Sequence, residues 1–257
     1  MRIRYIPADP AGNLTALALT RVPPGLRAQA AAQLMRQAAV EQAAFVDEES
    51  LSSPLPRMDM MGGEFCGNAS RAFGLYAAVR RGLGERELRV RVSGASEPVL
   101  VTLEPERGRA FAQMPLPHAL ETVRVGEKAV PVVRMEGIAH AVLLGEAPSP
   151  ALAQAVLASM PRESAQGVLF SQGARMTPLV HVAATGTSVW ESSCGSGSVA
   201  LAWLLSRNLP DGDHAFSFAE PGGSIEVRVS IRSGRAAFAT MGGRVSLGAE
   251  REIELAL

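Results

Sequence analysis

Two related stretches decide the fold of this 257-residue chain: Glu64-Phe65-Cys66-Gly67-Asn68-Ala69-Ser70-Arg71-Ala72 and Ser193-Cys194-Gly195-Ser196-Gly197-Ser198-Val199-Ala200. They contain its only two cysteines, and they share a Cys-Gly pair, a serine four residues after the cysteine and an alanine six residues after it. Each stretch continues into a helical pattern, at residues 71–80 and 199–207. Because the cysteines lie about half a chain apart, we predict two similar lobes, each with one thiol at the start of a helix. A small substrate would then bind between the two sulfur atoms.

The composition is that of a globular protein, with 47% hydrophobic and 19% charged residues. Lysine plus arginine and aspartate plus glutamate both total 25, so no net field favours nucleic acid or anionic lipid. The chain has no run of roughly 18 apolar residues, and its first residues do not resemble a signal peptide. We therefore predict a cytoplasmic protein without nucleic-acid or membrane partners, whose cysteines stay reduced.

The predicted elements follow a similar order in the two halves of the chain. Met114-Pro115-Leu116-Pro117 is the best linker, because its prolines break a strand ladder and stiffen a crossing. We predict an N-terminal lobe of residues 1–114 that carries Cys66 and is joined by the tail 246–257. A C-terminal lobe of residues 115–245 carries Cys194. One long helix is predicted from Leu26 to Phe45, where the chain is rich in Ala and Gln and lacks Gly and Pro.

Cysteines at helix starts suit proton transfer, although the helix alone does not ionise them. A free thiol has a pKa of about 8.5, so only roughly 3% is thiolate at pH 7. A helix N-terminus contributes about 0.3–1 kcal/mol, which is less than one pKa unit, so a neighbouring group or the substrate must supply the rest.

The same helix starts can hold a carboxylate on their unpaired N–H groups. Gly67 and Gly195 allow close backbone approach, and the side chains of Asn68 and Ser196 can add hydrogen bonds. With one thiolate as base and the opposite thiol as acid, a proton leaves one face of a stereocentre and another arrives on the other face. No cofactor or metal is needed for this chemistry in principle.

Other interpretations of the same residues stay open. Two unrelated cysteines are usually inert buried side chains. A metal site is disfavoured because neither cysteine has a CxxC partner or an adjacent histidine. Residues 195–200 also fit the pattern GxGxxA of dinucleotide-binding proteins, but no convincing βαβ unit with an acidic strand end follows.

The chain resembles the diaminopimelate epimerase family of pyridoxal-independent amino-acid racemases and epimerases. The similarity covers most of the chain, and the matching segments are Gly12-Asn13, Cys66-Gly67-Asn68, Gly137 with His140, Cys194-Gly195-Ser196-Gly197, Pro221-Gly222-Gly223 and Met241-Gly242-Gly243. The resemblance implies an α/β (α+β) fold of two pseudo-symmetric lobes, each a mixed sheet around a central helix. It further implies a homodimer, catalysis by Cys66 and Cys194, and substrate contacts from Asn13 and from the two cysteine blocks.

The substrate is predicted from where the chain departs from that family. Arg57, Ile138 and Ala184-Thr185-Gly186-Thr187 stand where diaminopimelate enzymes carry the polar groups that meet the far end of their substrate. The charged far end of diaminopimelate would be buried there without a partner, which costs binding free energy. The segment from Met58 to Cys66 instead is similar to a branch of the family that racemises histidine. Diaminopimelate epimerisation, a phenazine-type isomerase and a non-catalytic amino-acid-binding protein are the alternatives.

Three further side chains have two interpretations each. Glu64 either contacts Cys66 or the substrate amine, or is a helix-start carboxylate favoured by the dipole. Glu191 has the same two interpretations. His140 lies in an alternating apolar run, where a lone histidine is usually structural, but the resemblance implies a place beside Cys194.

Overall fold

The computed structural model describes residues 1–82, 84, 86–183 and 186–257. Within them the chain divides into two units, Met1–Gln113 with Gly242–Leu257, and Met114–Met241. The first crossing between the units falls at the predicted linker, where residues 114–118 belong to no helix or strand. The fold is mixed α and β and strand-rich, with α-helices α1–α4, so the predicted fold class is confirmed.

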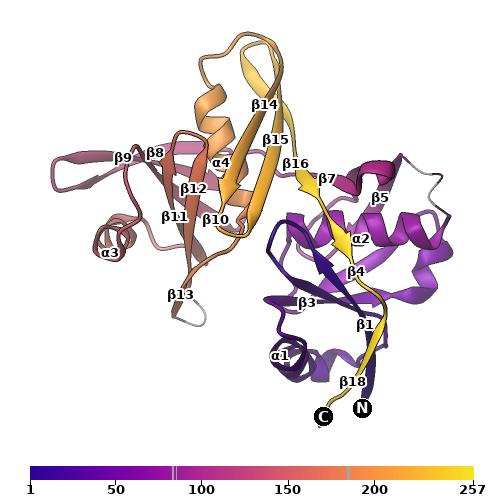
Figure 1. The fold of residues 1–257 in the computed structure, drawn as a ribbon. Coiled ribbons are helices and arrows are strands. Elements are labelled where there is room, and N and C mark those ends of the chain that lie inside the picture. Colours follow the sequence, from indigo (N-terminus) through magenta and orange to yellow (C-terminus); the bar gives the residue numbers. More distant parts are fainter. Residues whose placement is uncertain (83, 85, 184–185) are drawn as a thin grey trace. The chain divides into compact units, whose positions relative to one another are not determined.

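Unit 1 is built around two parallel strand pairs, each joined through a helix (Figure 1). Its elements are β1 (Arg2–Asp9), β2 (Thr15–Ala18), α1 (Arg27–Ala38), β3 (Gln42–Asp47), β4 (Arg57–Met60), α2 (Gly67–Arg80), β5 (Glu87–Val92), β6 (Val99–Glu104), β7 (Arg109–Gln113), β17 (Ser246–Leu247) and β18 (Arg251–Glu254), with short 3-10 turns at Pro24–Leu26, Glu48–Ser52 and Pro105–Arg107. β1 pairs antiparallel with β2, β2 parallel with β3 through α1, and β3 antiparallel with β4. β5, β6 and β7 form an antiparallel meander after α2.

Unit 2 repeats this order of connections. Its elements are β8 (Ala119–Val125), β9 (Lys128–Met135), β10 (Ile138–Leu144), α3 (Pro150–Ser159), β11 (Ala165–Gln172), β12 (Arg175–Val182), β13 (Thr187–Trp190), α4 (Gly195–Ser206), β14 (Gly212–Glu220), β15 (Gly223–Arg232) and β16 (Arg235–Arg244), whose last residues belong to unit 1. β9 pairs antiparallel with β10, β10 parallel with β11 through α3, and β11 antiparallel with β12. In each unit, one helix therefore joins a parallel strand pair and a second helix follows the next strands.

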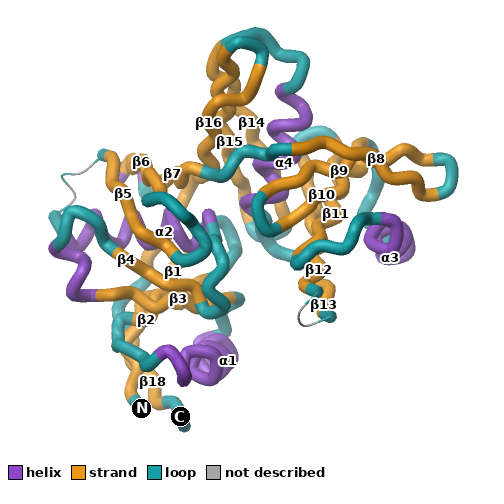
Figure 2. The backbone as a smooth tube through the Cα atoms, turned by 180° about the vertical axis from the view of Figure 1, so that it is seen from behind, coloured by secondary structure: helices purple, strands orange, loops and turns teal. Residues whose placement is uncertain are grey.

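The second helix of each unit is its buried centre. Every residue of α2 from Gly67 to Ala78 is buried, and α2 packs on β5, β6 and β7. α4 packs on β9, β10, β11, β14 and β15 of its own unit. α2 has no solvated face over these residues, whereas α4 is fully buried only over residues 197–202 and exposes Leu205 near its end. The small and apolar residues of the two buried segments fit this burial. α1, by contrast, covers β2 and β3 from outside and keeps an exposed side (Figure 2).

The predicted helix from Leu26 to Phe45 is wrong in its second part. α1 ends at Ala38, and Ala39 adopts the left-handed conformation with a φ of 53°. The chain then enters β3, in which Ala43 and Ala44 are fully buried and pair with Ala16 and Leu17 of β2. Burial on both faces of a sheet outweighs the helix propensity of alanine, which is worth less than 1 kcal/mol per residue. Strands β4 and β8 were not predicted either.

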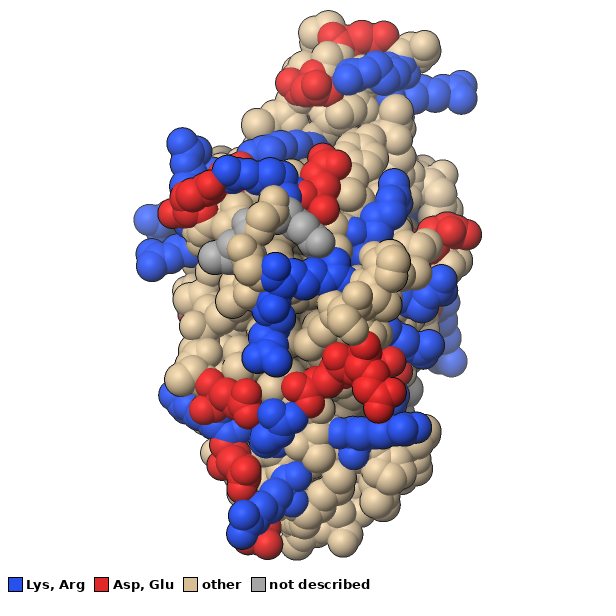
Figure 3. Space-filling model, turned by 90° about the vertical axis from the view of Figure 1, so that its right-hand side faces the viewer, with Lys and Arg blue, Asp and Glu red and all other residues tan. Residues whose placement is uncertain are grey.

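The surface carries both signs of charge. Acidic and basic side chains alternate over the face shown in Figure 3, in line with the zero formal net charge of the chain. Among the described residues, no helix is long and apolar enough to cross a membrane.

Candidate active site

Cys66 is the N-cap residue of α2. Its backbone is extended, with φ −132° and ψ 113°, and its sulfur accepts a hydrogen bond from the N–H of Ala69 at 3.5 Å. The hydroxyl of Ser70 donates to the carbonyl oxygen of Cys66 at 2.7 Å. The shared serine thus fixes the start of the helix, and the thiol takes the place of the usual capping oxygen.

A buried amide holds the other side of the Cys66 sulfur. The thiol donates to Oε1 of Gln42 at 3.5 Å, and Nε2 of Gln42 donates to Oδ1 of Asn13 and to the hydroxyl oxygen of Thr15, both at 2.8 Å. Nδ2 of Asn13 donates in turn to the carboxylate of Glu41 at 2.9 Å. This network connects the start of β3 with the residues before β2, and it fixes the Cys66 side chain through a neutral group.

Burial raises the pKa of the Cys66 thiol, which is the largest effect on it. The hydrogen bonds from the backbone of Ala69, with Gln42 and from the backbone of Asn68 oppose that rise, while the carboxylate of Glu64 adds to it. The Glu64 side chain is exposed. Helix and amide hydrogen bonds therefore moderate the cost of a thiolate at Cys66 without removing it.

Cys194 is the N-cap residue of α4, at the corresponding place in unit 2. Its N–H donates to Oε2 of Glu220 at 2.6 Å, and the hydroxyl of Ser198 donates to Oε1 of the same carboxylate. The shared serine therefore has a different partner in the two units. Burial raises the pKa of the Cys194 thiol well above its usual value, and the charges of Glu191 and Glu220 raise it further.

His140 and Ser196 line the other side of the Cys194 sulfur. The Ser196 hydroxyl lies 3.7 Å from Sγ of Cys194 and 2.9 Å from Nε2 of His140. His140 is fully buried on β10, and burial lowers its pKa to about 3, so its imidazole is neutral. Within the described part of the chain its Nδ1 has no hydrogen-bond partner. This nitrogen faces Gly167, where an added Cβ would lie only 2.1 Å away, so the neighbouring strand needs a glycine there.

The predicted site residues thus form two groups, one in each unit. Asn13, Glu64, Gly67 and Asn68 accompany Cys66, and His140, Glu191, Gly195 and Ser196 accompany Cys194; their roles toward a substrate stay predictions. Several side chains already have protein partners. Oδ1 of Asn68, for example, accepts a hydrogen bond from Nε of the fully buried Arg71 at 3.1 Å. The segment Ala184-Thr185, used above to predict the substrate, lies outside the described residues.

Glycines in the second cysteine block have a packing role. An added Cβ at Gly195 would lie 2.5 Å from Cε of Met241, and one at Gly197 would lie 2.7 Å from Cδ2 of Leu169. The GxGxxA pattern of this block is therefore explained by close packing around the start of α4, without a nucleotide.

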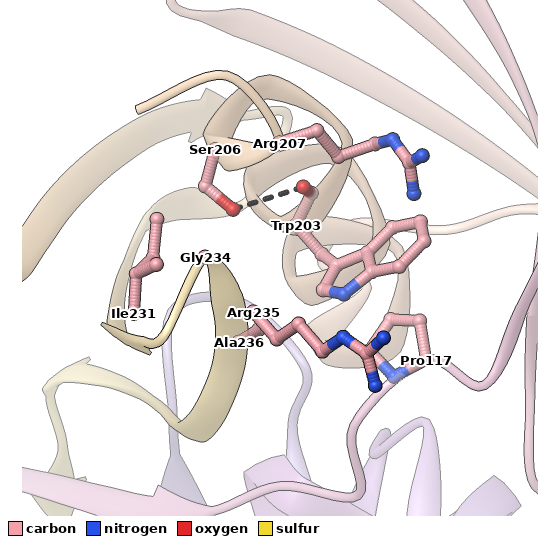
Figure 4. A pocket seen from close by; sticks show the side chains of 8 residues that line it. All are labelled: Pro117, Trp203, Ser206, Arg207, Ile231, Gly234, Arg235 and Ala236. Carbon is pink, nitrogen blue, oxygen red and sulfur yellow. Dashed lines mark hydrogen bonds between the residues drawn. The ribbon is translucent and has the colours of Figure 1, made fainter. Parts of the chain in front are cut away.

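A cavity of about 420 Å³ lies at the opposite end of α4 (Figure 4). Its lining includes Trp203, Ser206, Arg207 and Arg235, and the guanidinium of Arg207 lies 4.9 Å from the centre of the Trp203 ring. A 12-residue helix is about 18 Å long, so this cavity lies away from Cys194 and is not part of the cysteine site.

Two contact residues of the cysteines were missed by the sequence analysis, Gln42 and Glu220. Gln42 fell inside the wrongly extended helix, and Glu220 was interpreted as the first residue of a turn. A buried polar residue inside a run of alanines, Gln42-Ala43-Ala44, is the local signal that could have marked the first. Glu220 is 26 residues from Cys194, and only the fold brings the two together.

Comparison with known proteins identifies the family of the chain. Residues 2–253 match the family described as histidine racemase CntK N-terminal domain. A histidine racemase from Fusobacterium nucleatum is 28% identical over 225 residues, covering 79% of this chain and 80% of that protein. One from Staphylococcus aureus is 26% identical over 241 residues, covering 88% of each.

Solved structures share the fold at low identity. A phenazine biosynthesis protein of the PhzF family from Enterococcus faecalis has a TM-score of 0.67 at 16% identity, covering 99% of this chain and all of that one. A hydroxyproline epimerase from Agrobacterium vitis has a TM-score of 0.62 at 14% identity, covering 98% and 92%. Together with this fold, the family match and the two racemase relatives define a chain of the racemase and epimerase class.

Within that class, the chain belongs to the histidine racemase family, whose model spans nearly its whole length. The predicted family and branch are thereby confirmed.

Proposed function

We propose that this protein is a cofactor-independent histidine racemase that inverts the α-carbon with Cys66 and Cys194. The observation that carries the proposal is the equivalent placement of the two thiols, each an N-cap residue of the buried helix of its unit. The family match and the relatives named above support histidine as the substrate.

In this mechanism one sulfur removes the α-proton as a thiolate while the other, as a thiol, protonates the opposite face of the same carbon. General acid–base catalysis of this kind contributes about 10²–10⁴-fold each time a proton is transferred. Both thiols are hydrogen-bonded or flanked by polar groups: Cys66 by Gln42 and the backbone of Ala69, Cys194 by Ser196 and Glu191. These partners orient each sulfur.

The substrate carboxylate would bind to N–H groups in the first turns of α2 and α4. Such groups have no acceptor within their own helix, and the helix dipole favours an anion there. Gly67 and Gly195 are the first residues of the two helices. Donors held at the carboxylate stabilise the negative charge that develops when the α-proton leaves.

Proton exchange in heavy water tests this function. The protein is incubated without cofactor with L-histidine, with diaminopimelate and with a panel of other L-amino acids, and loss of the α-proton signal and inversion are followed. We expect exchange and inversion with histidine and not with diaminopimelate. Activity on diaminopimelate alone would refute the substrate. If no amino acid of the panel exchanges its α-proton or is inverted, the racemase function is refuted and an amino-acid-binding protein is favoured.

Two further properties stay predictions of the family resemblance and the sequence. We expect a homodimer, which light scattering of the purified protein would measure. We expect a cytoplasmic location, which fractionation of the source cells would test.

A further inference from the structure

A buried carboxylate distinguishes the helix start of unit 2. Glu220 is the last residue of β14 and is 8% exposed. It accepts hydrogen bonds from the N–H of Cys194 and from the hydroxyl of Ser198, so both of its oxygens face donors. Two donors and the positive end of the α4 dipole favour the ionised form of this carboxyl group.

The corresponding hydrogen bonds in unit 1 are to neutral groups, and the one carboxylate that raises the pKa of Cys66, that of Glu64, is exposed. Ser70, the equivalent of Ser198, donates to the carbonyl oxygen of Cys66. The side-chain partner of the Cys66 sulfur is the amide of Gln42. At the start of α2 the cysteine thiol therefore contacts an amide, whereas at the start of α4 the cysteine N–H contacts a carboxylate.

The groups that face the Cys194 sulfur come from four segments. Glu191 precedes it in the loop after β13, Glu220 ends β14, Ser196 and the N–H of Gly197 belong to α4, and His140 lies behind Ser196 on β10. Both acidic groups raise the pKa of the thiol through their charge, and the histidine is neutral because burial lowers its pKa to about 3. Two negative charges and burial therefore oppose a thiolate at this position, and one backbone N–H favours it.

We propose that Glu220 is a positioning residue that holds Cys194 at the start of α4 and keeps its sulfur protonated in the resting enzyme. For the enantiomer whose α-proton is taken by Cys66, the resting enzyme then has both groups in the required state, with Cys194 as the acid and Cys66 as the base; the roles swap for the other enantiomer. This assignment of roles rests on the racemase function proposed above.

The proton balance of one turnover follows from these roles. The Cys66 thiolate takes the α-proton and becomes a thiol, and the S–H proton of Cys194 moves to the opposite face of the carbon, which leaves a Cys194 thiolate. The free enzyme then returns to rest when Cys194 gains a proton from solvent and Cys66 loses one. Glu220 favours this return because its charge destabilises the Cys194 thiolate.

Titration of a single thiol tests the proposal without substrate. In the Cys66→Ser protein, Cys194 is the remaining cysteine, and the ultraviolet absorbance of its thiolate is followed against pH. Adding Glu220→Gln keeps the shape, and the amide can still accept from the N–H of Cys194 and donate to the Ser198 oxygen, so both partners named above keep a hydrogen bond to residue 220. We expect the titration midpoint to fall by about one unit or more, a tenfold gain in thiolate below the midpoint.

Matched variants separate charge from packing. Ser198→Ala keeps the carboxylate and removes one donor, and Glu146→Gln removes an exposed carboxylate of the same unit that pairs with Lys128; neither should lower the midpoint. An unchanged midpoint in Glu220→Gln, or an equal fall in Ser198→Ala, would overturn the proposal. A second comparison keeps Glu220 in both proteins. The thiol of Cys194 in the Cys66→Ser protein must titrate at a higher pH than the thiol of Cys66 in the Cys194→Ser protein. Because no histidine is present, these results stand apart from any failure of the racemase assay.

Discussion

Acid should destabilise unit 2 through His140. The imidazole is fully buried, its Nε2 contacts the Ser196 hydroxyl, and its pKa is lowered from 6.5 to about 3. In the unfolded chain the same group takes a proton below pH 6.5. Between pH 6.5 and about 3 the unfolded state therefore binds one more proton than the folded state, and stability falls as the pH is lowered through this window.

The size of the effect follows from the proton count. One excess proton in the unfolded state costs about 1.4 kcal/mol of unfolding free energy per pH unit. Lowering the pH from 6.5 to 5 should therefore remove about 2 kcal/mol, a large share of the roughly 5–15 kcal/mol that stabilises a typical domain. Above pH 6.5 this group should cause no pH dependence.

Urea unfolding followed by tryptophan fluorescence measures the stability of the unit that contains His140. Both tryptophans, Trp190 and Trp203, lie in unit 2, so their emission reports the unit that contains His140. The control is His140→Gln, which can still hydrogen-bond Ser196 but does not titrate. We expect the variant to be less stable at pH 7.5 and the gap to close as the pH falls to 5. Equal pH slopes in the two proteins would refute a neutral buried histidine.

Three further predictions concern the residues around the two sulfur atoms. Cys66→Ser and Cys194→Ser should each abolish inversion of histidine almost completely in the heavy-water assay, and full activity in either variant would contradict the two-thiol mechanism. Gln42→Leu removes the amide that holds the Cys66 thiol. Loss of such a hydrogen bond costs about 1–3 kcal/mol, so kcat should fall roughly tenfold to a hundredfold. An unchanged kcat would show that Gln42 has no role in the reaction. Gly167→Ala forces a methyl group against His140 and should lower the urea midpoint of unit 2 by the equivalent of about 1–3 kcal/mol; an unaffected midpoint would mean that the ring moves aside freely.

Local patterns predicted the parts of this fold that depend on neighbours in sequence. The Cys-Gly blocks and the apolar runs after them marked the starts of α2 and α4, because helix capping and helix burial are both visible within a few residues. Most strands, though not β3, β4 and β8, followed from alternating apolar residues and turn signals. The family resemblance then connected these elements to a reaction.

The remaining parts depend on contacts that no local pattern contains. The alanine run after Ala38 has helix propensity, yet β3 forms because β2 offers it a fully buried position. That error hid Gln42. Glu220 precedes a Pro-Gly-Gly turn, and only the return of β14 toward α4 turns it into a partner of Cys194. The position of both thiols at helix starts was readable from sequence, whereas the contact of Cys194 with Glu220 was not.

The return of the chain to β1 has a consequence for biosynthesis. β18 pairs with β1, and Arg71 binds the carbonyl oxygens of Gly243 and Arg244, so unit 1 needs segments from both sides of unit 2. Unit 2 is continuous in sequence, and all of it leaves the ribosome before the last segment of unit 1. Unit 1, although it begins first, must wait with an open sheet edge at β1 until residues 242–257 emerge, and it is the part most exposed to aggregation during translation.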